Sequence, residues 1–85
     1  MNLCLAVFRS RTQTYEFIEY MVRSGISCRA VTTPPEAHIG CGISAEFYIA
    51  HKSYAAEVIS KKGLNSFVAF YKITTRGRTT MTDRL

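Results

Sequence analysis

Cys41 is the residue of this chain best suited to chemistry, because it stands between two glycines in Gly40-Cys41-Gly42. Glycines carry no side chain that would shield a thiol, and they permit the positive φ values of tight loops. His38 lies three residues earlier and can shuttle a proton or lend positive charge to a thiolate. Since the thiolate is the nucleophilic form of cysteine, one interpretation of this spacing is a working thiol assisted by His38; the other is that His38 is a plain surface residue of the loop.

The segment that leads to this thiol is Thr33-Pro34-Pro35-Glu36. The two prolines fix φ, and the first of them restrains Thr33 to an extended conformation. Glu36 is either a plain turn residue or the start of a short helical turn. We therefore expect Thr33, Pro34 and Glu36 to support the loop that presents Cys41.

Two other roles for Cys41 stay open. It can pack inward between its glycines as a structural residue, or it can bind a metal. A zinc site of His38, Cys41, Cys28 and His51 matches no zinc-binding spacing. We expect neither a metal nor a cofactor.

Apolar periodicity and turn residues predict four strands and two helices around this loop. The strands are expected over residues 3–8, 26–32, 43–49 and 66–73, and the helices over residues 11–23 and 51–62. Ser10 and Gln13 form a capping box before the first helix, and Gly25 and Gly63 end the two helices. The order βαββαβ is the ferredoxin-like α+β arrangement, a four-stranded antiparallel sheet with both helices on one face.

The chain is expected to form one domain over residues 1–73, followed by a flexible basic tail over residues 74–85, where Thr, Arg and Gly show no periodicity.

Three cysteines without a CxxC pair favour a reducing compartment, so we expect a cytoplasmic protein. The apolar run over residues 2–8 is too short to span a bilayer, and we expect no membrane partner. The net charge of +5 indicates a solvated basic surface or attraction to RNA or an acidic partner.

Following the chain through this topology places six residues at one pole of the sheet. Arg9 and Arg11 end the first strand and begin the first helix, and Cys41 lies in the loop after the second strand. The second helix brings Lys61, Lys62 and Asn65 to the same pole. Cations and a helix N-terminus stabilise negative charge. The arrangement therefore predicts a favoured thiolate at Cys41, with His51 and the tail at the opposite pole.

The face of the sheet away from the helices is expected to be apolar and open. An open apolar face is unusual in a monomer, so we expect a homo-oligomer in which a second copy covers it. The residues expected in that contact are Phe67, Ala69, Tyr71 and Ile73, or the alternate set Val68 and Phe70.

The chain resembles the small bacterial selenium/sulfur (Se/S) carrier-like proteins. The resemblance covers residues 3–73 and rests on Val7-Phe8-Arg9-Ser10, on Ser24-Gly25-Ile26, and above all on Thr33-Pro34-Pro35-Glu36 followed by Cys41-Gly42. Pro35 replaces a basic residue of the family, and His38-Ile39-Gly40 replaces small polar residues.

The resemblance implies that Cys41 accepts sulfur or selenium as a persulfide or perselenide and passes it on. The implied partners are donor and acceptor proteins, including a donor of the cysteine desulfurase type. The chain is then a carrier more than a stand-alone enzyme. The alternative is a non-catalytic dimeric ferredoxin-like module that binds a small ligand, RNA or a protein, with Cys41 structural.

Overall fold

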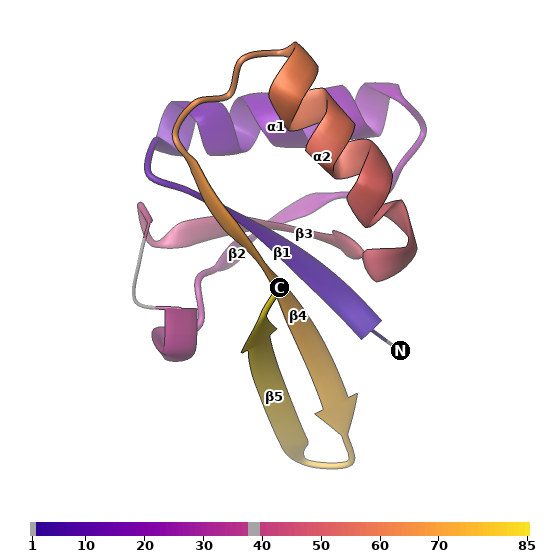
Figure 1. Ribbon diagram of the computed structural model, residues 1–85. Helices are drawn as coiled ribbons and strands as arrows, with labels where there is room; N and C mark the ends of the chain where they lie inside the picture. The colour runs from indigo at the N-terminus through magenta and orange to yellow at the C-terminus, as the bar shows by residue number, and fades with distance from the viewer. Residues whose placement is uncertain (1, 38–39) are drawn as a thin grey trace.

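The computed structural model describes residues 2–37 and 40–85, so that Met1, His38 and Ile39 lie outside the described residues. Two α-helices, five strands and two 3-10 turns follow each other along the chain (Figure 1). In chain order they are β1 (Asn2–Phe8), α1 (Arg11–Arg23), β2 (Arg29–Thr32), the turn η1 (Pro35–Ala37), β3 (Ile43–Tyr48), the turn η2 (Ile49–His51), α2 (Lys52–Lys61), β4 (Phe67–Arg76) and β5 (Thr79–Arg84).

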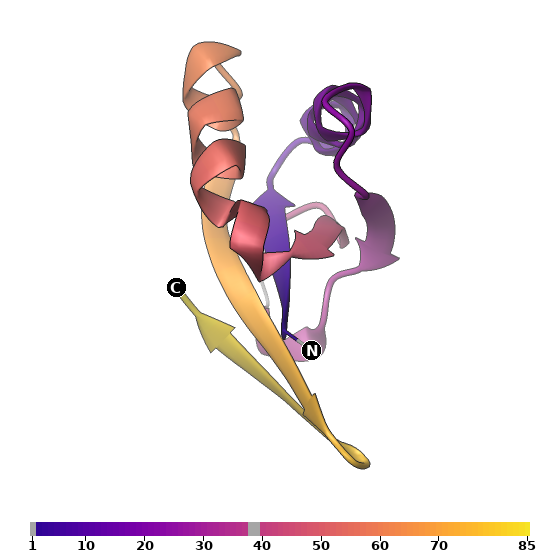
Figure 2. The same ribbon diagram turned by 90° about the vertical axis from the view of Figure 1, so that its right-hand side faces the viewer.

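The five strands form one antiparallel sheet in the order β2-β3-β1-β4-β5. Both helices lie on the same side of this sheet (Figures 1 and 2). The predicted α+β class is confirmed, and the predicted βαββαβ order describes the chain as far as β4. The predicted number of four strands is wrong, because β5 adds a fifth strand beside β4.

The fifth strand lies where the sequence suggested a flexible tail. Residues 74–76 belong to β4, and residues 79–84 form β5, so the expected domain boundary after Ile73 falls inside a strand. Gly77 begins the two-residue connection with φ +59°, the conformation that tight hairpin turns require. Threonine is β-branched and favours strands. The run of threonines that looked aperiodic is a hairpin arm.

The helix-covered face carries the larger of two buried clusters. Alternate residues of β1 point to it, and they pack against apolar residues of both helices. Its fully buried members include Cys4, Ala6, Phe8, Phe17, Met21, Ala45 and Ala55. This cluster fixes α1 across β1 and β3, so the start of α1 is held next to the end of β1 (Figure 1).

The opposite face is not open, contrary to the expectation. Leu5 and Val7 of β1 are buried there with Ala37 of η1, and β4 contributes Ala69, Tyr71 and Ile73, which are at most 9% exposed. The loop that follows β2 folds back over this face, and β5 contacts η1 beside it. Most of the apolar surface that was assigned to a second copy is therefore covered by the chain itself.

A bulge explains why Phe67 does not share a face with Ala69. Val7 pairs with Ala69, but the next residue, Phe8, pairs with Phe67, so that β4 has one residue more than β1 at this point. Phe67 and Phe70 consequently both pack against the helix-side cluster.

Within the described part of the chain, neither helix has the length and hydropathy to cross a membrane.

Candidate functional site

The loop that carries Cys41 is closed at its base by two hydrogen bonds of Thr33. Its backbone N–H donates to the Gly42 carbonyl oxygen at 2.9 Å, and its hydroxyl is 2.6 Å from the hydroxyl of Ser44. Ser44 is fully buried on β3, so Thr33 provides the partner that its hydroxyl needs. Thr33 thus supports the loop through its side chain as well as its extended backbone.

The prolines shape the next turn. The Ala37 N–H donates to the Pro34 carbonyl oxygen at 3.0 Å, which closes η1, and Ala37 is only 2% exposed against the second cluster. Glu36 lies within η1, as the alternative of a short helical turn predicted. This turn anchors the loop to the sheet before the chain reaches the thiol.

Gly40 brings the loop against the end of β1. It adopts φ +95°, and a Cβ built on it would lie 2.7 Å from Val7 Cγ1 and 2.8 Å from the Phe8 carbonyl oxygen. The Cys41 N–H donates to that same carbonyl oxygen at 3.1 Å. Gly42, at φ +89°, has open space where its Cβ would be. Only glycine fits at position 40, whereas position 42 needs glycine for its backbone angle alone.

The sulfur of Cys41 lies in the corner between β1, α1 and β3. Its thiol is half-buried and faces the Ile43 carbonyl oxygen at 3.5 Å and the Thr14 hydroxyl at 3.7 Å. Gly40 and Gly42 on either side are exposed. The sulfur thus has hydrogen-bond partners on α1 and β3, and the residues on either side of Cys41 carry no side chains.

The other two cysteines are held in the helix-side cluster. Burial raises the pKa of the Cys4 thiol to about 11, with Lys52 lowering it in part. Burial also raises the pKa of the Cys28 thiol to about 12, and the charge of Glu46 adds to this. The protonated form of both thiols is therefore favoured at neutral pH.

The four basic residues predicted at the pole of Cys41 have different surroundings. Arg9 and Arg11 flank Ser10, the N-cap of α1, and both are exposed. Lys61 pairs with Glu57 at 2.6 Å, and this hydrogen bond raises the pKa of Lys61. The Nζ atom of Lys62 lies 5.0 Å from the ring centroid of Tyr20. The two lysines thus have partners on the helices, whereas the arginines stand at the helix end that contacts the thiol.

His38, the predicted proton shuttle, lies outside the described residues. His51 belongs to η2, before α2. No three metal-ligating side chains converge anywhere in residues 2–37 and 40–85. Around Cys41, the described residues offer a thiol and its hydrogen-bond partners, the Thr14 hydroxyl and the Ile43 carbonyl oxygen.

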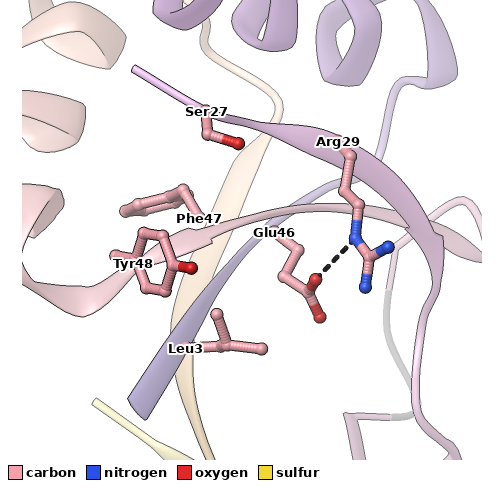
Figure 3. A pocket seen from close by; sticks show the side chains of 6 residues that line it. All are labelled: Leu3, Ser27, Arg29, Glu46, Phe47 and Tyr48. Atoms are coloured by element: carbon pink, nitrogen blue, oxygen red, sulfur yellow. Dashed lines mark hydrogen bonds and ion pairs between the residues drawn. The ribbon is translucent and has the colours of Figure 1, made fainter. Parts of the chain in front are cut away.

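Two cavities lie at the face of the sheet opposite the helices, and Glu46 lines both of them. The larger, of about 300 Å³, is drawn in Figure 3, where Arg29 pairs with Glu46 at 2.8 Å beside Leu3 and Tyr48. The smaller, of about 180 Å³, lies between Pro34 and β5. Neither of these two cavities is lined by Cys41.

Thr14 is the site residue that sequence reasoning missed. It is fully buried on α1 in line with Phe17 and Met21, at the i, i+3, i+7 spacing of the core-facing stripe. A hydroxyl among apolar positions of such a stripe was the available signal. Its approach to Cys41 depends on how the loop after β2 returns to α1, which the sequence pattern does not specify.

The geometry defines a class of protein: a small α+β domain that presents one half-buried thiol on a glycine-flanked loop at the start of a helix. Comparison with known families gives one match. The chain belongs to the family described as "Putative Se/S carrier protein-like", whose profile matches residues 3–68 and so includes the whole Cys41 loop. No curated protein and no solved structure matches the chain.

Proposed function

We propose that the protein is a carrier of sulfur or selenium that holds the atom on Cys41. The Cys41 thiolate attacks the outer sulfur of a donor persulfide. A new S–S bond forms at Cys41, the S–S bond of the donor breaks, and the donor leaves as a thiolate. An acceptor thiolate then attacks the same outer sulfur and releases Cys41. With selenium as the outer atom, the same exchange gives a perselenide.

The observation that carries this proposal is the contrast among the three thiols. Cys41 is flanked by exposed glycines, whereas burial raises the pKa values of Cys4 and Cys28 to about 11 and 12. A carrier needs one thiol that reacts and room for one further heavy atom on it. Family membership adds support, because the family to which the chain belongs is described as Se/S carrier-like.

The partners of such a carrier are a donor protein that forms a persulfide, such as a cysteine desulfurase, and an acceptor protein. A carrier thiol also has to stay reduced between transfers, so we place the protein in the cytoplasm. The exposed backbone of Gly40 and Gly42 is the surface that both partners need to approach.

The test is loading with a low-molecular-weight persulfide, followed by mass spectrometry of the intact protein and its peptides. The expected result is a gain of one sulfur atom on the peptide that contains Cys41. Cys41→Ser should abolish the gain, whereas Cys28→Ser should keep it and serves as the matched control. A wild-type protein that gains no sulfur, or gains it equally on Cys28, overturns the proposal.

A second candidate function, an RNA-binding module, is favoured by the arm formed by the distal part of β4 and β5. The arm projects from the body of the molecule (Figures 1 and 2). It carries Arg76, Arg78 and Arg84, all exposed, against the single carboxylate of Asp83. Exposed arginines on a projecting ribbon attract phosphates, and threonine hydroxyls hydrogen-bond to them.

This second function predicts RNA affinity that falls steeply as salt is raised. The measurement is fluorescence anisotropy with a labelled RNA, for the wild-type protein and for Arg76→Gln/Arg78→Gln. A reduced salt slope in the double variant supports the module. Equal affinity in the two proteins contradicts it, and Cys41→Ser should leave this binding unchanged.

A further inference from the structure

A buried hydroxyl stands where the core-facing stripe of α1 would ordinarily carry an apolar side chain. Thr14 is 0% exposed and belongs to the same buried stripe as Phe17 and Met21. Its Oγ1 is 3.0 Å from the Ser10 carbonyl oxygen, one turn earlier in the helix, and 3.7 Å from Cys41 Sγ. The hydroxyl thus has one partner inside the helix and one on the thiol loop.

The contacts around the sulfur differ in what they can do. The Ile43 carbonyl oxygen, 3.5 Å from Sγ, can only accept a hydrogen bond, so it suits the protonated thiol. A hydroxyl can both donate and accept, and its hydrogen rotates. Thr14 is therefore the side chain at this corner that can serve the sulfur in either protonation state.

The Ser10 carbonyl makes such a rotation possible. It accepts the Thr14 backbone N–H at 3.0 Å as well as the Thr14 hydroxyl. When the hydroxyl turns away, this carbonyl keeps its backbone hydrogen bond, so no buried polar group is left without a partner. Turning the hydroxyl from the helix toward the sulfur leaves the rest of the hydrogen bonds intact.

We infer that Thr14 is a positioning residue for Cys41, whose hydroxyl donates to the sulfur once the thiol has lost its proton. This inference rests on the proposed carrier function for its purpose. In the resting thiol, Sγ–H donates to the Ile43 carbonyl oxygen and Thr14 donates to Ser10. In the thiolate, the Thr14 hydroxyl donates to Sγ, which holds the nucleophile in the corner between α1 and β1.

The charged residues near this corner are the same whatever residue 14 is. Arg9 and Arg11 flank the helix start. Substitutions at position 14 that exchange only uncharged side chains leave every charged residue of the chain unchanged. A difference in Cys41 reactivity between such variants therefore reports on the hydroxyl.

The experiment measures the rate at which iodoacetamide alkylates Cys41 as a function of pH, by peptide mass spectrometry. Thr14→Val removes the hydroxyl and keeps the shape, and Thr14→Ser keeps the hydroxyl. We expect Thr14→Val to slow alkylation at neutral pH about tenfold and to move the pH profile upward by about one unit, the low end of the range for a hydrogen bond to a charged group. Thr14→Ser should stay within about twofold of the wild type on the same basis. Thr12→Val, an exposed change on the same helix, is the matched control.

The inference is overturned if Thr14→Val alkylates with the wild-type rate and profile, or if Thr14→Ser loses as much as Thr14→Val. Alkylation of Cys4 shows whether a variant has unfolded, because that thiol is buried in the native chain. Should Thr14→Val not fold, Thr14→Ala replaces it in the comparison with Thr14→Ser. Persulfide loading is measured separately. If the wild-type protein is not loaded, the carrier function is wrong, but the alkylation rates still decide whether the Thr14 hydroxyl acts on Cys41.

Discussion

The two glycines around Cys41 predict different costs for the same substitution. Both have positive φ, +95° at Gly40 and +89° at Gly42, so an alanine at either position is strained. A left-handed conformation costs a non-glycine residue about 1–2 kcal/mol. At Gly42 that is the whole cost, because the space where the Cβ would be is open.

At Gly40 a second cost is added. The Cβ would lie 2.8 Å from the Phe8 carbonyl oxygen, which is backbone in a central strand and cannot move aside, and 2.7 Å from Val7 Cγ1, which is buried. Overpacking a well-filled interior costs about 1–3 kcal/mol. We therefore expect Gly40→Ala to lower the free energy of unfolding by about 2–5 kcal/mol and Gly42→Ala by about 1–2 kcal/mol.

The assay is urea unfolding of both variants and the wild type under identical conditions, with the m-value as a check that the unfolded states are comparable. Gly40→Ala should also change the alkylation rate of Cys41, because the Cys41 N–H is bonded to the same Phe8 carbonyl oxygen. Equal destabilisation by the two variants would refute the reasoning, since it would mean that the loop does not rest on β1.

Three further predictions concern Cys4, Thr33 and the last strand, β5. The Cys4 thiol holds its proton more tightly in the folded protein, because its pKa rises from 9.0 to about 11. This adds to the free energy of unfolding below pH ~9, and the added stability is lost as the pH rises toward 11. The free energy of unfolding should therefore fall by about 2 kcal/mol between pH 8 and pH 10.5. Urea unfolding at the two pH values checks this, and a Cys4→Ala variant with the same pH dependence would contradict it. Thr33→Val leaves the buried hydroxyl of Ser44 without its partner and should cost about 1–3 kcal/mol; adding Ser44→Ala should recover part of the loss, and an additive double variant would argue against a shared hydrogen bond. Deleting residues 77–85 removes the strand beside β4 and exposes Ile73, so it should destabilise the fold by about 1–2 kcal/mol in urea, whereas a flexible tail could be removed without loss.

The sequence predicted the helices and the first four strands because their signals are local. The Ser10 hydroxyl accepts the Gln13 N–H at 3.1 Å, as the capping box required, and the glycines after both helices adopt positive φ. The side chain of Gln13 instead bonds Ser66, the residue before β4: the Ser66 backbone N–H donates to Gln13 Oε1, with 2.9 Å between nitrogen and oxygen. That contact joins residues 53 positions apart, which no local pattern indicates.

The wrong predictions, an open sheet face and a flexible tail, have one physical cause. Whether the face opposite the helices is open depends on where the loop after β2 folds, and whether residues 79–84 form a strand depends on an edge being available beside β4. Ala37 looked like a loop residue, yet it is buried among β1 and β4 side chains. Both features are decided by long-range packing, which overrides local composition.

The surroundings of the Cys41 thiol are set by the scaffold more than by the loop that carries it. The Cys41 N–H is bonded to the last residue of β1, and the sulfur faces a helix side chain and a β3 carbonyl. The loop contributes two glycines, of which Gly40 lets the backbone reach β1 because it has no side chain. A substitution in the junction of β1 and α1 should therefore change the chemistry of Cys41 even though it touches no residue of the loop, and Thr14 is the position where this can be tested without altering charge.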